Sequence, residues 1–370
     1  MVLKQIELQN FRLHKNTSIE FSDKLNLIVG GNGQGKTTIL EAIYYLCTTK
    51  NLHLSAESEV VTYDESYFEI TGKFIDLTEE KARLTYDNQK NKKTYYLNEK
   101  QINSAAEIIG KFPVVSLTQS DHSITQGAPA DRRKFIDSII SQISQAYLKI
   151  LLEYSKILKQ RSLILNQIRE NRNVNLYSQL DAWTEALIKR GIEIIEQRKK
   201  FIVDFDNYLK EAYKQIMSDE EIPTIIYSTQ INNEENKEKE FREALENQKE
   251  EEIRKSMNLI GPHRDDYIFY LNGKELKRYG SQGQHKTFQI ALRFAQFFYI
   301  QEKISKSPIF LMDDIFGELD KYRAEKISSY LPKVGQAFIT MTDLTKKEEL
   351  GELLDTLLIK VENGKTTIIN

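Results

Sequence analysis

The sequence predicts an α/β protein whose mixed sheets surround a glycine-rich loop, with an inserted, mainly helical second domain. Three observations predict this fold. An apolar strand pattern at 25–29 passes through the loop into a helical pattern, short strand patterns occupy both ends of the chain, and 131–217 has helical periodicity. We therefore expect 1–130 and 256–370 to be two parts of one lobe, with 131–255 inserted between them.

Composition narrows the classes of protein to which the chain can belong. The formal net charge is −2 over 370 residues, so any contact with nucleic acid must come from local basic patches. The single cysteine, Cys47, excludes an intrachain disulfide and fits a reducing cytosol. No apolar stretch reaches the roughly 18 residues of a membrane span, and no signal peptide is recognisable. We therefore expect a cytoplasmic protein with no membrane partner.

The glycine-rich loop carries the first chemical motif. Gly30 to Thr37 matches G-x-x-x-x-G-K-[ST] between a strand and a helix, which is the context that a phosphate-binding loop (P-loop) requires. Glycines let backbone N–H groups turn toward a polyphosphate, and the helix N-terminus adds partial positive charge. Lys36 can reach the β- and γ-phosphates of a nucleoside triphosphate such as ATP, and Thr37 can hold Mg²⁺ through its hydroxyl. The predicted nucleotide-binding residues here are Gly30, Gly31, Asn32, Gly33, Gln34, Gly35, Lys36, Thr37 and Thr38.

A second motif lies near the C-terminal end of the chain. The apolar run Ile309–Met312 is followed by Asp313 and Asp314, which is the form of a Walker B strand. We expect Asp313 to hold Mg²⁺ through water. We expect Asp314 to act as the catalytic base that orients and deprotonates the attacking water.

The segment 280–284, Gly-Ser-Gln-Gly-Gln, precedes a helical pattern. Ser281 is a natural N-cap there, and its N–H and hydroxyl can face an anion. A serine-capped helix after a glycine is common in proteins. The position of this one, about 30 residues before the Walker B strand, is what makes it a candidate site.

The remaining patterns place the other elements. Further strands are expected at 3–8, 17–21, 66–76, 82–87, 93–97, 113–117, 222–227, 267–271, 274–277, 336–341, 356–361 and 366–369. The helical pattern at 131–217 breaks at 171–175, which predicts an antiparallel pair of long helices. Other helices are expected at 231–256, where the charge run indicates a solvated face, at 284–301 and at 321–331.

The order of these motifs resembles the ABC-type ATPase heads of the SMC group and, more narrowly, the RecF family of bacterial DNA replication and repair proteins. The resemblance covers essentially the whole chain, with a short helical insert in place of a long coiled coil. Besides the P-loop, Gln119 and the two acids, it rests on Asn10-Phe11-Arg12, Gly127-x-Pro129-x-x-Arg132-Arg133, Gly261–Asp266, Tyr279–Gln284 and Gly317–Asp320. It implies an ABC-type ATPase head with mixed sheets around the P-loop.

The resemblance also implies roles for single residues. Arg12 contacts the nucleotide phosphates, and Gln119 is the Q-loop residue, placed with the catalytic and metal-contacting residues because it senses Mg²⁺ and the γ-phosphate. Ser281 and Gly283, with Gln284 beside them, form the signature that caps the γ-phosphate of ATP held by the partner subunit. ATP is then sandwiched between two copies and drives a homodimer.

Two further positions differ from the usual ABC pattern. The resemblance places Asp320 in the D-loop, across the dimer seam, but this D-loop opens with Gly317 where Ser or Ala is usual. The switch position usually holds a His after a strand, but residues 338–343 contain none. Thr342 or Asp343 is left to replace it.

The implied partners are duplex and gapped DNA and the proteins RecR, RecO and RecA. With RecR and RecO, a member of this family supports the loading of RecA. The resemblance further implies weak, DNA-stimulated ATP hydrolysis that resets the dimer, and association with the nucleoid. The sequence itself gives weaker support for DNA binding than the resemblance does. Basic clusters at 132–134, 189–190 and 198–200 can contact phosphates, but a solvated helix face accounts for each of them equally well.

Alternative functions stay open at the level of sequence. One is an ABC-type ATPase subunit coupled to another partner, either in transport, which needs a membrane partner, or as an SMC-like structural linker. A linker needs a longer arm, because a hairpin of about 35 residues per helix spans only about 50 Å. A nuclease carrying such a head needs a catalytic domain, and we expect none after residue 345.

Overall fold

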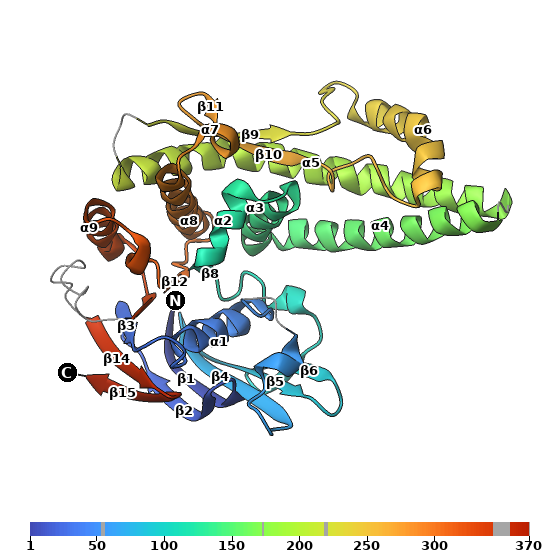
Figure 1. The fold of residues 1–370 in the computed structure, drawn as a ribbon. Helices are drawn as coiled ribbons and strands as arrows, with labels where there is room; N and C mark the ends of the chain where they lie inside the picture. The colour runs from blue at the N-terminus through green and yellow to red at the C-terminus, as the bar shows by residue number, and fades with distance from the viewer. Residues whose placement is uncertain (53–55, 172–173, 218–220, 343–355, 370) are drawn as a thin grey trace. The chain divides into compact units, whose positions relative to one another are not determined.

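A computed structural model describes residues 1–52, 56–171, 174–217, 221–342 and 356–369 (Figure 1). Its contacts divide the chain into two compact units. Unit 1 comprises Met1–Asp121, Glu211–Glu221 and Lys286–Asn370, and unit 2 comprises His122–Lys210 and Ile222–His285. The fold is α/β, with mixed and antiparallel sheets and a largely helical second unit, as predicted. The domain limits predicted at residues 130 and 255 remain a prediction.

The sheet that bears the P-loop has the strand order β15-β14-β3-β13-β12-β8. Its strands are β3 (Leu25–Val29), β8 (Val114–Leu117), β12 (Ile309–Asp313), β13 (Ala337–Met341), β14 (Thr356–Glu362) and β15 (Lys365–Ile369). All pair in parallel except β14 with β15. Every residue of β3, β8 and β13 is buried, and most of these residues are apolar, as expected for parallel strands that are covered on both faces. Parallel strands end at one edge of a sheet, so the loop after β3 and the acids after β12 share that edge.

The second sheet of unit 1 is antiparallel, with the order β2-β1-β4-β5-β6-β7. Its strands are β1 (Val2–Phe11), β2 (His14–Glu20), β4 (Tyr67–Ile75), β5 (Glu79–Asp87), β6 (Lys92–Leu97) and β7 (Lys100–Ile102). The helix α1 (Lys36–Thr48) packs against strands of both sheets. Its side chains Ile39, Ile43 and Leu46 belong to one continuous core with residues of the two sheets.

Two further α-helices lie mostly or wholly in unit 1. Most of α8 (Gln282–Ile304) lies in this unit, where Phe294 meets Phe310 of β12 edge to face. The shorter α9 (Lys321–Tyr330) follows the acids of β12. Tyr330, in the last turn of α9, packs against Phe294.

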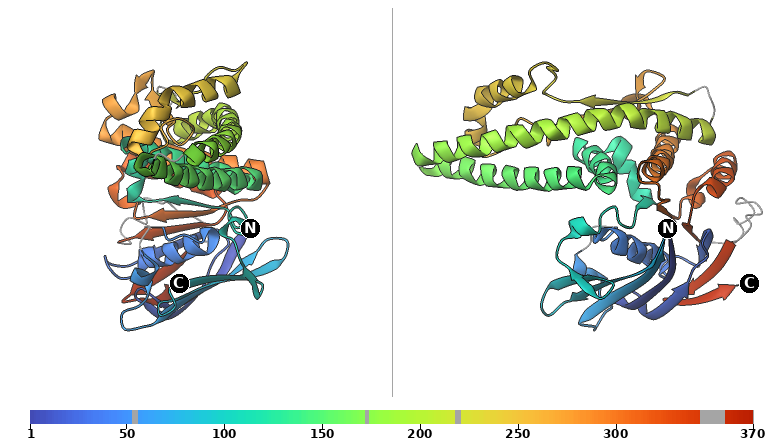
Figure 2. Two further views of the ribbon diagram at one scale, coloured as in Figure 1. Left: turned by 90° about the vertical axis from the view of Figure 1, so that its right-hand side faces the viewer. Right: turned by 180° about the vertical axis from the view of Figure 1, so that it is seen from behind.

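Unit 2 is built mainly of helices, and its first four follow one another along the chain. These are α2 (His122–Gln126), α3 (Pro129–Ile143), α4 (Gln145–Asn171) and α5 (Val174–Ile216), the last of which ends in unit 1. α4 and α5 run side by side in every view (Figures 1 and 2), and Leu165 and Ile168 of α4 share a buried cluster with Leu180 of α5. The predicted pair of long helices with a break near 171–175 is therefore confirmed. The pattern did not show that α3 ends before α4, at Ser144.

A small sheet with the order β11-β10-β9 completes unit 2. β9 (Pro223–Ser228) and β10 (Asp266–Leu271) pair antiparallel, and Asn272-Gly273, both with positive φ, make the predicted tight turn. β11 is only Lys274–Glu275, because the chain continues as the short helix α7 (Leu276–Tyr279) where a strand to residue 277 was predicted.

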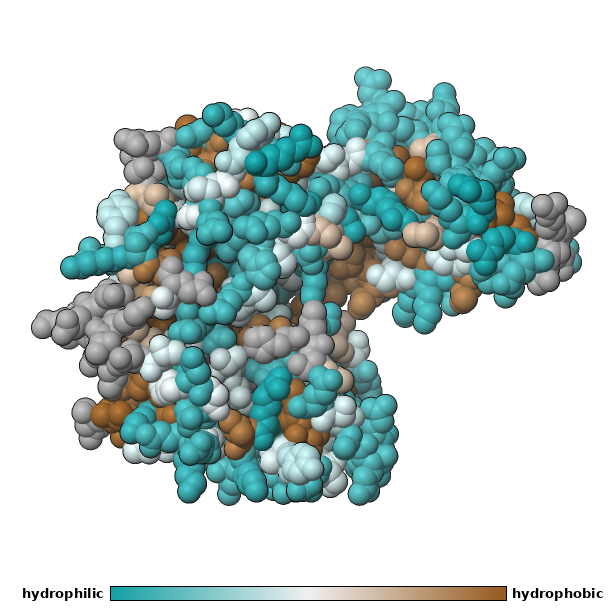
Figure 3. All heavy atoms as spheres, in the orientation of Figure 1, coloured by the Kyte–Doolittle hydropathy of each residue, from teal (hydrophilic) through white to brown (hydrophobic). Residues whose placement is uncertain are grey.

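The charged segment of unit 2 is a solvated helix, as predicted, but a shorter one. α6 spans Lys237–Lys255, because the side chain of Asn236 caps its first turn by accepting a hydrogen bond from the N–H of Lys239. The surface over α6 is hydrophilic (Figure 3). Within the described residues of the whole chain, no helix combines the length and the apolar character that crossing a membrane requires.

Candidate nucleotide site

The P-loop follows β3 and ends at the first turn of α1. Gly33 and Gly35 have left-handed backbone conformations, with φ of 75° and 105°. The Nζ of Lys36 is folded back onto the loop and donates to the carbonyl of Gly31 at 2.8 Å. Burial lowers the pKa of Lys36, and the carboxylates of Asp314 and Asp313 oppose that shift. The lysine is therefore a desolvated cation held beside two acids.

A pocket of about 400 Å³ opens in front of this loop. It is lined by Arg12, Leu13, Asn32, Gly33, Gly35, Lys36, Thr37, Thr38, Glu59 and Asp314. The lining joins four segments that are distant in sequence: the turn between β1 and β2, the P-loop, the short 3-10 helix Glu57–Val60, and the end of β12. Concave sites of this size commonly bind small ligands. The predicted loop residues Gly30, Gly31 and Gln34 are outside the lining, although Gly31 accepts from Lys36.

Two of the three residues predicted to contact the metal, Thr37 and Asp313, meet directly. The hydroxyl of Thr37 donates to Oδ1 of Asp313 at 2.8 Å. Thr340 of β13 donates to the same oxygen at 2.7 Å, and its own hydroxyl accepts from the N–H of Asp314 at 2.8 Å. Thr340 therefore orients both acids. It was missed because only the pairing of β12 with β13, which sets Asp313 opposite Thr340, brings it to the site.

Asp314 lies at the pocket with φ of 50°, a left-handed conformation that is uncommon outside glycine. Within the described residues, no group of three or more His, Cys, Asp or Glu side chains is arranged to hold a metal ion. Thr37 and Asp313 nevertheless fit Mg²⁺, because this ion is usually held by few protein oxygens, together with phosphate oxygens and water.

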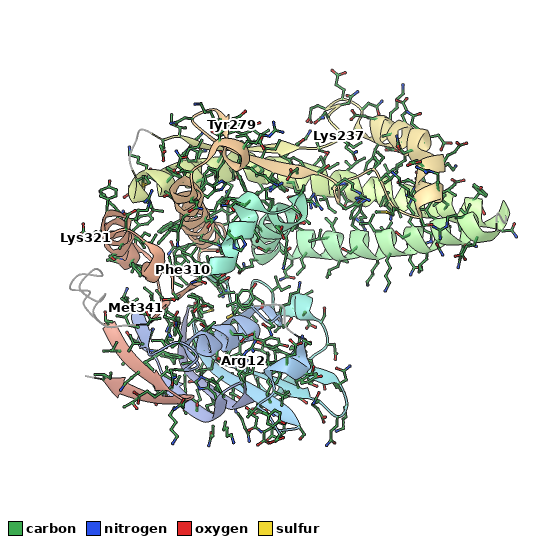
Figure 4. The ribbon with its side chains drawn as sticks, in the orientation of Figure 1. Arg12, Lys237, Tyr279, Phe310, Lys321 and Met341 are labelled. Carbon is green, nitrogen blue, oxygen red and sulfur yellow. The ribbon has the colours of Figure 1, made fainter. Side chains whose placement is uncertain are left out.

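Arg12 reaches the pocket from the turn after β1 and lies beside α1 (Figure 4). Its Nε and Nη2 donate to the two carboxylate oxygens of Glu41 at 2.5 and 2.9 Å. Glu41 is almost fully buried in α1, so it anchors the guanidinium from within the core. Glu41 was not among the residues predicted for the site. Its signal was an acidic residue on the apolar helix that follows the P-loop.

Gln119 is exposed just beyond β8, and it is not one of the residues that line the pocket. The order of β8 next to β12 brings it to the same edge of the sheet as the acids. Two residues later, Asp121 accepts two hydrogen bonds from Arg293 of α8, at 2.6 and 2.8 Å. This buried pair ties the segment after Gln119 to α8.

The signature residues lie in unit 2. Ser281 caps α8: its hydroxyl accepts from the N–H of Gln284 at 3.2 Å, and Oε1 of Gln284 accepts from the N–H of Ser281 at 2.9 Å. This reciprocal pair is a capping box. Ser281 is exposed, and Gly283 is partly buried in the first turn of the helix. The predicted N-cap is therefore confirmed.

Asp320 caps α9 by accepting from the N–H of Arg323 at 2.9 Å, and its carboxylate also pairs with the guanidinium of Arg323. The backbone N–H of Arg323 is the main cause that lowers the pKa of Asp320. Of the two candidates for the switch position, Thr342 is exposed just after β13, and Asp343 lies outside the described residues.

Two arginines of the predicted basic clusters form ion pairs inside unit 2. Arg132 and Arg198 are buried. Arg132 forms a bidentate ion pair with Asp266 at 2.7 and 2.9 Å. Arg198 does the same with Asp137 at 2.8 and 3.0 Å. Neither guanidinium is on the surface, so neither is available to a phosphate backbone.

Comparisons with known proteins place this geometry in a class. The family model "RecF/RecN/SMC N terminal domain" matches residues 2–366. The chain is 17% identical to an SMC head domain from Pyrococcus furiosus with a TM-score of 0.58, covering 99% of this chain and 95% of the other, which is a likeness of fold alone. The fold and the P-loop site therefore define a P-loop ATPase head of the RecF/RecN/SMC class.

Within that class, the relatives are more specific. The chain is 38% identical to the DNA replication and repair protein RecF of Chloroherpeton thalassium, covering 93% of this chain and 95% of the relative. It is 36% identical to RecF of Salinibacter ruber, covering 92% and 85%. A solved structure of the recombination mediator protein RecF with ATP in the RecFOR pathway has a TM-score of 0.90 and 29% identity, covering 100% and 97%. The chain belongs to the RecF family.

Proposed function

We propose that this protein binds ATP with Mg²⁺ in the P-loop pocket and uses it to control a homodimer on DNA during recombinational repair. The observation that carries the proposal is the joining of the P-loop to the acids of β12, through the 2.8 Å hydrogen bond from Thr37 to Asp313. The ATP-bound RecF structures, 29% identical to this chain over its whole length, support nucleotide binding here.

Each residue at the pocket has a proposed task. Lys36 exchanges its contact with Gly31 for the β- and γ-phosphates, which suits a partly desolvated cation. Thr37 and Asp313 would hold Mg²⁺, which neutralises phosphate charge when bound. Arg12 contacts phosphate from its anchor on Glu41. Asp314 orients the attacking water and takes its proton, and Gln119 senses the metal and the γ-phosphate.

The remaining predicted residues are proposed to act across a dimer interface. Ser281 and Asp320 are both exposed and both located at helix N-termini, where partial positive charge favours an anion. Ser281, Gly283 and Gln284 would cap the γ-phosphate of ATP bound to the other copy, with Asp320 beside the seam. Charge-assisted hydrogen bonds of this kind contribute about 1.5–3 kcal/mol each, so a few of them can populate a dimer that is otherwise weak.

The DNA-related part of the proposal rests on relatives named DNA replication and repair protein RecF and on the RecFOR pathway named for the solved structures. Duplex and gapped DNA are the proposed ligands, with weak, DNA-stimulated hydrolysis that releases the dimer, and with RecR, RecO and RecA as partners at the nucleoid. The alternative of an SMC-like linker is not favoured, because the 27 residues of α4 span only about 40 Å.

The test is the oligomeric state, measured by sedimentation with Mg²⁺ and ATP, with and without gapped duplex DNA. We expect the wild type to dimerise only with ATP, and Asp314→Asn, which binds but does not hydrolyse ATP, to persist as a dimer. Ser281→Arg should bind ATP and stay monomeric. Ser155→Arg, at another exposed helical serine, is the matched control and should behave as the wild type. Wild-type protein that stays monomeric with ATP, in both the presence and the absence of DNA, contradicts the proposal.

A further inference from the structure

A buried histidine lies directly behind the P-loop. His14 begins β2 and is fully buried. Its Nε2 is 3.0 Å from the carbonyl oxygen of Gly35, the residue before Lys36. Its Nδ1 is 3.0 Å from the hydroxyl of Thr17, which also contacts the carbonyl of Gly364 at 3.0 Å. No motif contains His14, and it does not line the pocket.

The partners of His14 determine where its proton is. A carbonyl oxygen only accepts hydrogen bonds, so the 3.0 Å contact with Gly35 requires a hydrogen on Nε2. The Thr17 hydroxyl has one hydrogen and lies near both Nδ1 and the Gly364 carbonyl, so it serves one of them at a time. Burial lowers the pKa of His14, which favours the neutral ring with its hydrogen on Nε2.

Holding the Gly35 carbonyl also orients the next N–H group. The peptide between Gly35 and Lys36 is planar and trans, so its C=O and N–H point to opposite sides. A carbonyl held toward His14 therefore turns the N–H of Lys36 away from this histidine. Lys36 lines the pocket, whereas His14 does not. That N–H is in the first turn of α1, where helix geometry leaves it without a partner inside the helix.

A second anchor holds the preceding peptide in the same way. The β14–β15 turn is Asn363-Gly364, with φ of 48° and 75°. The N–H of Gly364 donates to the backbone carbonyl of Gln34 at 3.0 Å, and the N–H of Asn363 donates to Oε1 of Gln34 at 2.7 Å. By the same planarity, the N–H of Gly35 turns away from the β14–β15 turn.

The packing around these contacts is tight. A Cβ on Gly35 would lie 2.9 Å from Nε2 of His14, and a Cβ on Gly364 would lie 2.2 Å from the carbonyl oxygen of Leu13. Both glycines have positive φ, which other residues adopt at a cost. The P-loop is therefore braced from its outer side by β2 and by the C-terminal hairpin of the chain.

We propose that His14 is a positioning residue for the triphosphate: it donates to Gly35 and, with the Asn363-Gly364 turn, holds the P-loop peptides so that their N–H groups face the phosphates. The proposal rests on the proposed binding of ATP. Beyond that proposed function, His14 and the Asn363-Gly364 turn affect the phosphates indirectly, through the conformation of the P-loop. A preformed loop binds more tightly because its peptides do not have to be ordered on binding.

The test compares His14→Leu, which removes the donor, with His14→Gln, whose amide nitrogen can still donate to Gly35. His263→Leu is the matched control, since His263 is largely buried and its Nε2 lies 3.0 Å from a backbone carbonyl of unit 2, that of Asn258. The measurements are the Kd for ATP with Mg²⁺ and the thermal unfolding midpoint without nucleotide. Loss of one hydrogen bond predicts about 10-fold weaker binding for His14→Leu, with most of the affinity restored in His14→Gln. His263→Leu should lower the midpoint and leave the Kd unchanged.

Two outcomes would overturn the inference while leaving ATP binding in place. One is an unchanged Kd in His14→Leu. The other is a loss in His14→Leu that His14→Gln does not restore. Wild-type protein that does not bind ATP would instead overturn the proposed function and this inference with it. If His14→Leu does not fold, ¹⁵N NMR of wild-type histidines decides: hydrogen on Nε2 of His14 supports the inference, and hydrogen only on Nδ1 overturns it.

Discussion

Each unit contains an arginine that is held by a buried glutamate, but the two guanidinium groups have different surroundings. In unit 2, the side chains of Arg161 and Glu252 are 2% and 0% exposed, and the guanidinium also donates to Asn258 and Thr184. In unit 1, Glu41 is equally buried at 1%, but the Arg12 that it holds is 30% exposed and lines a pocket. We call a network closed when all of its charged groups are buried and bonded to one another, as around Arg161, and such a network stabilises the fold. A network that leaves a charged group at a cavity, as around Arg12, marks a candidate binding site.

Removing one partner of a closed network should have the largest effect. Arg161→Met removes the cation that pairs with the buried carboxylate of Glu252 and leaves it the N–H of Leu259, so we expect a loss of about 3–5 kcal/mol in the free energy of unfolding. ATP affinity should not change in the folded protein. Urea denaturation measures the loss. The double variant Arg161→Met with Glu252→Leu should regain much of it, and a loss below about 1 kcal/mol would mean that this network does not stabilise unit 2.

The reverse pattern is expected at the pocket. Lys36→Met should weaken ATP binding by about 100-fold, because it removes a charge-assisted contact to phosphate. The free energy of unfolding should change by less than about 1 kcal/mol, because burial already disfavours the charged form of this lysine. Titration calorimetry and urea denaturation measure the two quantities. Lys50→Met, at an exposed lysine just past α1, is the control and should bind ATP normally. Equal affinity in both variants would remove Lys36 from the site.

A buried histidine of unit 2 predicts a pH effect on stability. Burial lowers the pKa of His263 to about 4, from about 6.5 when unfolded. The unfolded state therefore binds more protons between these values, and the contribution of His263 to stability is complete above pH 6.5 and is lost as the pH falls toward 4. The expected loss is about 1.4 kcal/mol at pH 5.5 relative to neutral pH. His263→Gln should flatten the curve of unfolding free energy against pH, and two parallel curves would rule out the effect.

The smallest effect is expected for an ion pair that neither unit buries. The Nζ of Lys4 lies 2.5 Å from Oδ1 of Asp23, and the two side chains are 39% and 52% exposed. A double-mutant cycle with Lys4→Met and Asp23→Asn should give a coupling free energy below about 1 kcal/mol, because water screens the pair. A coupling as large as that of Arg161 with Glu252 would erase the distinction between closed and exposed networks.

Much of the fold followed from local patterns in the sequence. The strand, loop and helix at 25–48 are adjacent in the chain, and their periodicity and glycines indicate both the structure and the anion-binding chemistry. The same holds for Ser281 as a helix cap and for the Asn272-Gly273 turn. The boundary between α3 and α4 was missed because helical periodicity continues across Ser144, which does not form part of either helix.

What the tertiary structure decided was the set of partners. Glu41, Thr340 and His14 belong to no motif, and they reach the P-loop or its acids through helix packing, strand register and the burial of β2. The sequence likewise named Arg132 and Arg198 as possible contacts for DNA, but folding pairs them with Asp266 and Asp137 in the interior of unit 2. The spacing of residues within a motif indicates which chemistry that segment can perform. The partner of each such residue is a side chain that is distant in sequence. Tertiary packing selects this partner, and no local sequence pattern encodes the choice.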